Sequence, residues 1–156
     1  MPVTRRRRTV AATPAEVWRT VSDPHQMPRW WPRVERVEGV DGRGFTQVLR
    51  SDRGALVRAD FRFGTRHKPT TISWSQELRG TPFERLLRSS ETTVALQDAG
   101  AGATAVELRI EQRLNGMSRL GGFLVRRAAR RQLDGALDGL VALYGAAAAA
   151  RLTNGS

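Results

Sequence analysis

The chain has 156 residues, no cysteine and a formal net charge of +11 at neutral pH. Its length suits a single domain that buries roughly 70% of its unfolded surface, and the lack of cysteine excludes disulfides and thiolate chemistry. No run of about 20 apolar residues occurs, and no apolar segment follows the basic start, so neither a spanning helix nor a secretory signal is predicted. We expect a soluble, cytoplasmic protein.

Nearly all of the positive charge is arginine, since Lys68 is the only lysine. Two interpretations of this excess stay open. Abundant arginine together with abundant alanine is typical of codon bias in a high-GC genome, in which case the charge carries no function. Alternatively, it indicates an anionic partner, such as nucleic acid, a membrane surface or an acidic ligand.

The chain is expected to begin with a strand at residues 3–10 that has a basic middle, although four consecutive arginines are also typical of an arm that binds polyanions. A short helix follows, because Thr13 is a good N-cap, Pro14 takes the first helical position and Glu16 completes a capping box. The helix is expected to end at Ser22-Asp23-Pro24, where a second short helical turn starts that is expected to stop before Pro28.

Alternation of apolar and polar residues predicts a run of antiparallel strands in the middle of the chain. The pattern is cleanest near the end of this run, where every second side chain is apolar. Turns rich in glycine, proline and aspartate separate the strands. The expected strands are residues 34–40, 45–50, 55–63, 71–78, 83–96 and 104–114.

Residues 117 to about 149 are expected to form one long helix, followed by a frayed tail at 151–156. At about 100° per residue, Arg126 and Arg130 fall within roughly 20° of Leu137 on the apolar stripe. A buried arginine needs a partner. Either the helix bends, or the arginines extend outward or pair with a strand carboxylate, or one of them faces a cavity and holds an anionic or carbonyl group of a ligand.

This order of elements predicts an α+β domain in which a sheet of six or seven strands packs on the long helix. Because a twisted sheet and a helix curve differently, space remains between them, and that space is the expected ligand site. The side chains expected to line it are Trp30, Phe61, Phe63, Trp74, Gln76, Leu108, Ile110, Gln112, Phe123, Arg126 and Arg130.

No motif specifies catalysis or metal binding. Residues 100–105 match the loose dinucleotide pattern G-x-G-x-x-A, but a strand rather than a helix is expected to follow them. His25 and His67 fall in unrelated turns without a carboxylate cluster, so neither a metal site nor a cofactor is expected. Catalytic residues stay unassigned.

Residues 13–38 combine a Thr-Pro step before an E-x-V-W helix, then an Asp-Pro step, then a Trp-Pro step into a strand. This signature resembles that of the SRPBCC superfamily, also called START-like or helix-grip proteins, and in particular its bacterial polyketide cyclase/dehydrase branch. The C-terminal segment RRQLDGALDGLVAL is also similar. The residues that carry the resemblance are Thr13, Pro14, Glu16, Val17, Trp18, Asp23, Pro24, Trp30 or Trp31, and Pro32.

The resemblance covers nearly the whole chain. It implies that residues 1–150 form one START-like ligand-binding domain, in which a seven-stranded antiparallel sheet grips the C-terminal helix. Two short helices between the first and second strands would close one end of the sheet.

For function, the resemblance implies that a hydrophobic small molecule of lipid, polyketide or isoprenoid type binds between sheet and helix. One alternative is a polyketide cyclase or dehydratase that uses the same cavity, which requires a titratable group other than arginine inside it. Another is a basic interaction module for RNA, the ribosome or an anionic membrane, which predicts one contiguous arginine face. Binding is favoured over both, and the oligomeric state is left open.

Overall fold

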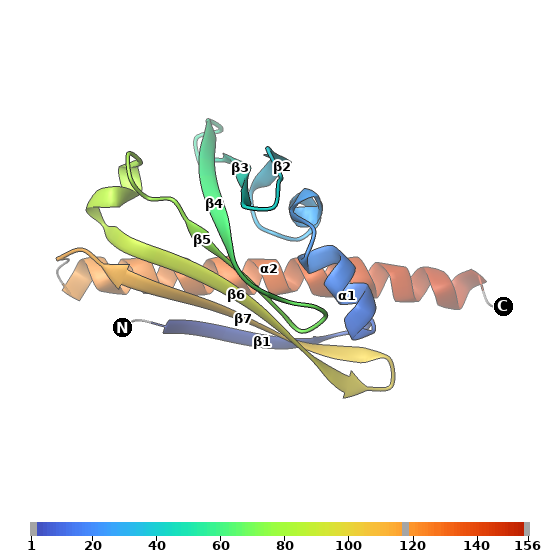
Figure 1. Ribbon diagram of the computed structural model, residues 1–156. Coiled ribbons are helices and arrows are strands. Elements are labelled where there is room, and N and C mark those ends of the chain that lie inside the picture. The colour runs from blue at the N-terminus through green and yellow to red at the C-terminus, as the bar shows by residue number, and fades with distance from the viewer. Residues whose placement is uncertain (1–2, 117–118, 155–156) are drawn as a thin grey trace.

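The computed structural model describes residues 3–116 and 119–154, and it confirms the expected α+β helix-grip fold. One antiparallel sheet has the strand order β1-β7-β6-β5-β4-β3-β2, and Figure 1 shows it curving in front of the long helix α2. The elements are β1 (Val3–Val10), α1 (Pro14–Val21), the 3₁₀ helix η1 (Pro24–Arg29), β2 (Val34–Glu38), β3 (Gly44–Arg50), β4 (Leu56–His67), β5 (Thr71–Gln76), the 3₁₀ helix η2 (Pro82–Arg85), β6 (Leu87–Gly100), β7 (Ala103–Leu114) and α2 (Arg119–Asn154).

The two helices between β1 and β2 form close to where the sequence predicts them, but η1 does not stop before Pro28 as expected: it includes Pro28 and ends at Arg29. The capping box is present: the Thr13 hydroxyl accepts the Glu16 backbone N–H at 3.3 Å, and the Glu16 carboxylate accepts the Thr13 N–H at 3.4 Å. Asp23 then caps η1 by accepting the backbone N–H of His25 at 3.0 Å. These caps define where both helices begin, and buried side chains such as Val17 and Met27 pack the helices against the core.

The strand expected from residue 83 begins only at Leu87, because η2 takes the residues before it. The Thr81 hydroxyl accepts the Phe83 N–H at 3.2 Å, and the Glu84 carboxylate accepts the Gly80 N–H at 3.0 Å. The Thr-Pro-x-Glu sequence that starts α1 therefore recurs here and starts a shorter helix.

Other boundaries also differ from the sequence-based expectation: β2 and β5 end earlier, at Glu38 and Gln76, and β6 continues to Gly100. β4 continues through the turn expected at Gly64 as far as His67, because the ladder with β5 shifts register after Phe63 and Thr65 donates its N–H to the Ser73 hydroxyl at 2.8 Å. Helix α2 continues beyond residue 149 to Asn154. The expected start of this helix at 117–118 and the last two tail residues, 155 and 156, lie outside the described residues.

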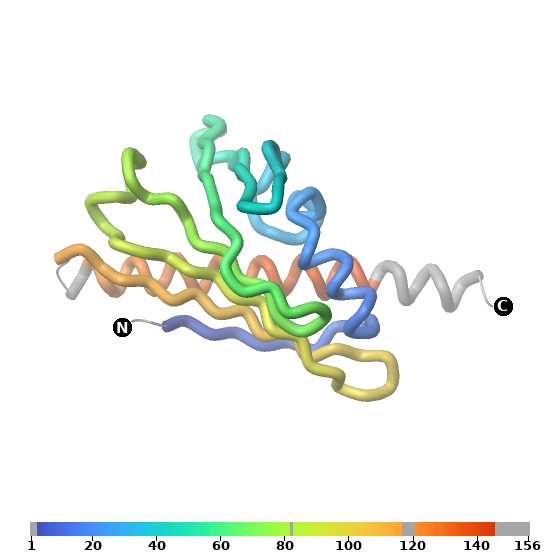
Figure 2. The backbone as a smooth tube through the Cα atoms, viewed as in Figure 1, coloured from blue at the N-terminus to red at the C-terminus, as the bar shows by residue number. Residues whose placement is uncertain are grey.

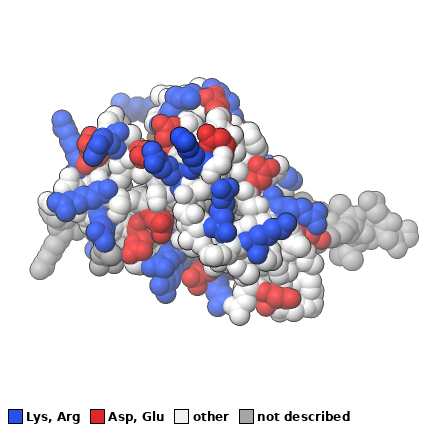
Figure 3. Space-filling view, in the orientation of Figure 1, with Lys and Arg blue, Asp and Glu red and all other residues white. Residues whose placement is uncertain are grey.

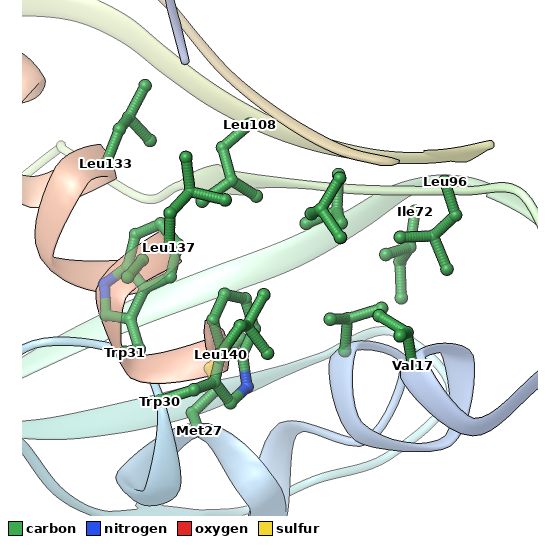
Figure 4. Close-up of a cluster of buried hydrophobic side chains, with 14 of the residues drawn as sticks. Val17, Met27, Trp30, Trp31, Ile72, Leu96, Leu108, Leu133, Leu137 and Leu140 are labelled. Carbon is green, nitrogen blue, oxygen red and sulfur yellow. The ribbon is translucent and has the colours of Figure 1, made fainter. Parts of the chain in front are cut away.

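The core lies between the concave face of the sheet and the middle of α2. Leu133, Leu137 and Leu140 on α2 are each 1% exposed or less, and they pack toward Leu108 and its neighbours on the sheet. Figure 4 shows Met27, Trp30 and Trp31 beside these leucines. Side chains therefore fill much of the space in which the sequence predicts a cavity.

Helix α2 is held on two sides. Along β1, which lies beside it in Figure 2, Arg6 pairs with Asp134 at 3.1 Å and Arg8 pairs with Asp138. On another side, Gly139 lies so close to the segment between η1 and β2 that a Cβ atom there would be 2.4 Å from the Trp30 carbonyl oxygen. Within the described part of the chain, no helix is both long enough and apolar enough to cross a membrane.

Candidate ligand-binding groove

A groove of about 910 Å³ opens between the N-terminal half of α2 and the strands β3 and β4. Four separate parts of the chain form its walls: the segment leading into β2, the β3–β4 hairpin, η2 and α2. The volume lies within the ~300–1,000 Å³ typical of small-molecule sites. The lining residues are Pro32, Arg33, Leu49, Arg50, Ser51, Val57, Phe83, Leu124, Arg127, Ala128, Arg131 and Gln132.

The β3–β4 hairpin positions one apolar wall. Leu49 and Val57 are directly opposite each other in the ladder, and the turn between them is fixed by hydrogen bonds in both directions between Ser51 and Ala55, at 2.8 and 3.1 Å. Because residues opposite each other in a ladder point to the same face, both side chains reach the groove.

Helix α2 supplies the facing wall. Leu124, Arg127, Ala128 and Arg131 follow the spacing i, i+3, i+4, i+7, so they share one side of the helix. Phe83 enters from η2, whose Thr81 cap was described above. The groove therefore depends on elements that are far apart in the sequence.

Arginines carry the charge of the groove. Arg33 pairs with Asp52, and Arg50 pairs with Glu35 at 2.5 Å; these four residues line an adjoining depression of about 480 Å³. Arg127 and Arg131 are exposed and have no carboxylate partner among the described residues. The helix wall is therefore positively charged, while the opposite wall is apolar with its arginines neutralised.

Three groups with shifted pKa values lie outside the groove. Hydrogen bonds from Arg36 and Arg58 lower the pKa of Glu38, and hydrogen bonds from the backbone N–H groups after Asp41 lower the pKa of that carboxyl. Burial raises the pKa of Tyr144. None of these three groups lines the groove.

Four of the residues predicted to contact a ligand lie in the core. Trp30, Trp74, Leu108 and Ile110 are each 3% exposed or less. Trp74 packs edge-on against Trp31, with ring centroids 5.7 Å apart. The indole N–H groups of Trp30 and Trp31 are buried without an acceptor in the described structure.

The remaining predicted residues on β4, β5 and β7, namely Phe61, Phe63, Gln76 and Gln112, are half-buried. Phe61 stacks on Phe45 with ring centroids 5.3 Å apart, and the Arg66 guanidinium lies 4.3 Å from the Phe63 ring centroid. Gln76 is opposite Phe61 in the ladder, and Gln112 lies two strands further along.

The predicted residues on α2 are more exposed. Phe123 is 47% exposed, Arg126 is exposed and Arg130 is half-buried. None of the eleven residues predicted from the sequence lines the groove described above. Their role as ligand contacts stays a prediction.

Sequence reasoning missed the groove because its helix wall looks like a solvent face. Leu124, Arg127 and Arg131 lie away from the apolar stripe that identifies the buried side of α2. The spacing of these residues is visible in the sequence. The close approach of β3 and β4 to that side of the helix is not, because it depends on the curvature of the whole sheet.

The charge distribution on the outer face of the sheet is mixed. Figure 3 shows Lys and Arg interspersed with Asp and Glu over this face. Ion pairs such as Arg62–Glu77 and Arg109–Glu111 account for part of the pattern. Across the described residues, no cluster of three or more His, Cys, Asp or Glu side chains has the arrangement of a metal site.

Comparison with known proteins gives a family match. Residues 1–145 match the family described as "Polyketide cyclase / dehydrase and lipid transport". A search of curated proteins gave no significant match.

Solved structures share the fold at low sequence identity. The di-domain ARO/CYC protein BexL from the BE-7585A biosynthetic pathway is 22% identical with a TM-score of 0.77, over 90% of this chain and 45% of that one. XoxI from Bacillus cereus is 14% identical with a TM-score of 0.76, over 92% and 96% of the two chains. A START superfamily protein from Mycobacterium smegmatis is 13% identical with a TM-score of 0.75, over 92% and 97%.

Proposed function

Since this chain belongs to the polyketide cyclase/dehydrase and lipid transport family, we propose that it binds a hydrophobic small molecule of lipid, polyketide or isoprenoid type in the groove between α2 and the β3–β4 hairpin. The observation that carries the proposal is a groove of about 910 Å³ whose apolar side chains come from four parts of the chain.

The apolar lining supports this proposal on energetic grounds. Leu49, Val57, Phe83 and Leu124 line the groove, and the last three are among the exposed large hydrophobic residues. Covering apolar surface gains roughly 25 cal/mol per Å². A ligand that covers these side chains would gain binding free energy by removing their apolar surface from water.

The charged residues of the groove favour binding over acid–base catalysis. The ionisable side chains that line it are Arg33, Arg50, Arg127 and Arg131. Arginine does not lose its proton in proteins, so these groups can hold a ligand or stabilise an anion but do not exchange protons. A cyclase or dehydratase activity would therefore rely on a polar group elsewhere on the concave face, or on water.

The decisive measurement is native mass spectrometry of the protein purified from its own organism. We expect an additional mass that remains bound under native conditions and is released on denaturation. The mass would identify the class of ligand.

A variant with a filled groove tests the location. Ala128 lines the groove, so Ala128→Trp is expected to reduce the co-purified ligand at least several-fold. Ala142 is exposed elsewhere on α2, and Ala142→Trp is the matched control that should keep the ligand. Equal ligand content in both variants would show that the groove is not the binding site.

A further inference from the structure

The groove combines an apolar wall and a charged wall, and this combination narrows the class of ligand. Of the seven large hydrophobic residues that are exposed in the described structure, six belong to three segments at this end of the molecule: the start of β4, η2 and its end, and the start of α2. One from each segment lines the groove: Val57, Phe83 and Leu124, which are 36%, 42% and 53% exposed. The wall formed by the β3–β4 hairpin and η2 therefore suits an apolar chain, and Leu124 extends the apolar surface onto α2.

The opposite wall carries two arginines that are free to bind an anion. Arg127 and Arg131 are four residues apart on one side of α2, and two like charges at this spacing destabilise a helix slightly. The nearest carboxylate along the helix is Asp134, which pairs with Arg6 at 3.1 Å. The lining contains no Asp or Glu in the part of the chain that the structure describes.

The other two arginines of the groove are already engaged. Arg33 pairs with Asp52, and Arg50 pairs with Glu35 and also donates to the Gly54 carbonyl at 2.8 Å. An anion entering the groove would have to compete with these carboxylates on the hairpin side, but among the described residues it would meet no competing carboxylate on the helix side. The position of a negative group is therefore set by α2.

We propose that the ligand is a single-chain anionic amphiphile, and this inference rests on the binding function proposed above. Its carboxylate, phosphate or sulfonate group would lie between Arg127 and Arg131, where guanidinium groups form charge-assisted hydrogen bonds. Its apolar chain would lie along Leu49, Val57 and Phe83. The arginines also give the groove an orientation, with the charged end of the ligand at the helix.

The test compares dodecanoate with methyl dodecanoate, which has nearly the same chain but no charge. Binding is measured by displacement of a dansyl-labelled fatty acid from the full chain, with each probe below its aggregation concentration. We expect dodecanoate to bind about tenfold or more tightly than its ester, which corresponds to about 1.4 kcal/mol. Dodecyl phosphate should bind like dodecanoate.

The Arg127→Gln/Arg131→Gln double variant should lose this preference. Dodecanoate affinity is expected to fall about tenfold, while methyl dodecanoate affinity stays within about twofold. The control is Arg5→Gln/Arg7→Gln, which removes the same charge from two exposed positions on β1. An equal loss in the control would show that net charge, rather than these two arginines, holds the anion, and it would overturn the assignment.

Other outcomes separate this inference from the proposed function. Equal binding of acid and ester would overturn the anionic class and leave the hydrophobic groove in place, whereas binding of neither probe would contradict both proposals. A larger loss in Arg126→Gln/Arg130→Gln would place the anion on the neighbouring side of α2 and overturn the site. If the protein sediments with phosphatidylglycerol vesicles but does not bind monomeric dodecanoate, its anionic partner is a bilayer surface rather than a ligand in the groove.

Discussion

Tyr144 connects the C-terminal half of α2 to α1 through its hydroxyl group. The Tyr144 and Thr20 hydroxyl oxygens are 2.5 Å apart, and the Tyr144 hydroxyl also donates to the Glu16 carbonyl at 3.1 Å. Thr20 is buried, so it has little access to water as a substitute partner. The contact joins residues 124 positions apart in the chain.

Tyr144→Phe is therefore expected to lower the free energy of unfolding by about 1–2 kcal/mol, because it leaves a buried hydroxyl without its partner. Urea denaturation at neutral pH measures the change. The double variant Tyr144→Phe/Thr20→Val should be destabilised by less than the sum of the two single variants, because it leaves no unpaired hydroxyl. An unchanged midpoint in Tyr144→Phe would contradict the prediction.

Burial of the Tyr144 hydroxyl gives a pH dependence with a defined sign, because it outweighs the opposite effect of the hydrogen bond with Thr20 on the pKa. Burial raises the pKa of Tyr144 above its ordinary value in the folded state, so the protonated form is favoured by folding. The stability that the protonated Tyr144 hydroxyl contributes is fully present below its unfolded-state pKa of about 10. It is lost as the pH rises through the folded-state pKa. The difference in stability between the wild type and Tyr144→Phe should therefore shrink above about pH 10.

At the scale of elements, α2 depends on glycine for its contact with the segment that enters β2. A Cβ atom at Gly135 would lie 2.8 Å from the Pro32 side chain, and one at Gly139 would lie 2.4 Å from the Trp30 carbonyl oxygen. The Gly139 contact is with backbone, which cannot rotate away. Close approach here also sets the distance between α2 and the β2 side of the groove.

Gly139→Ala is expected to destabilise the protein by about 1–3 kcal/mol, because overpacking against backbone outweighs the gain in helix propensity. The control is Gly145→Ala in the same helix, where a Cβ atom meets nothing within 4 Å. That change should stabilise by up to about 1 kcal/mol. Thermal unfolding shows whether each variant has a lower or a higher unfolding midpoint than the wild type. An unchanged or higher midpoint in Gly139→Ala would contradict the close contact.

Local sequence signals were enough to predict the strands and the helices α1, η1 and α2, but not the short helix η2 or all of the element lengths. The same Thr-Pro-x-Glu signature begins the eight-residue helix α1 and the four-residue η2. After Glu16 the chain continues with Val17 and Trp18, whose buried side extends the helix. After Glu84 it continues into the residues of β6, and pairing with β7 ends the helix.

The site was less predictable than the fold because it depends on long-range geometry. The sequence places Arg126 and Arg127 about 100° apart on α2, but it does not say which side meets the curled part of the sheet. The pairing of Arg6 with Asp134 also joins positions far apart in the chain. Both facts follow from how the sheet curves around the helix.

At the scale of the whole molecule, the positive charge is only partly neutralised. In the described structure, eight arginines share seven carboxylates in ion pairs. The arginine side chains in these pairs are 36–76% exposed. Exposed pairs contribute about 0–1 kcal/mol each. The formal net charge of +11 therefore leaves repulsion that these pairs do not remove.

Screening of this repulsion gives a test that involves the whole chain. We expect sodium chloride to stabilise the protein between about 20 and 200 mM, because the screening length falls from about 20 Å to below 10 Å and repulsion acts over longer distances than the ion pairs do. A gain of about 1 kcal/mol would appear as a rise of roughly 2–4 °C in the unfolding midpoint. A fall would mean that the surface ion pairs outweigh the repulsion. Sodium sulfate separates general screening from anion binding. If sulfate raises the stability of the protein more than chloride does at equal ionic strength, the difference measures anion binding. Its absence in Arg127→Gln/Arg131→Gln would assign that binding to the arginine pair on α2.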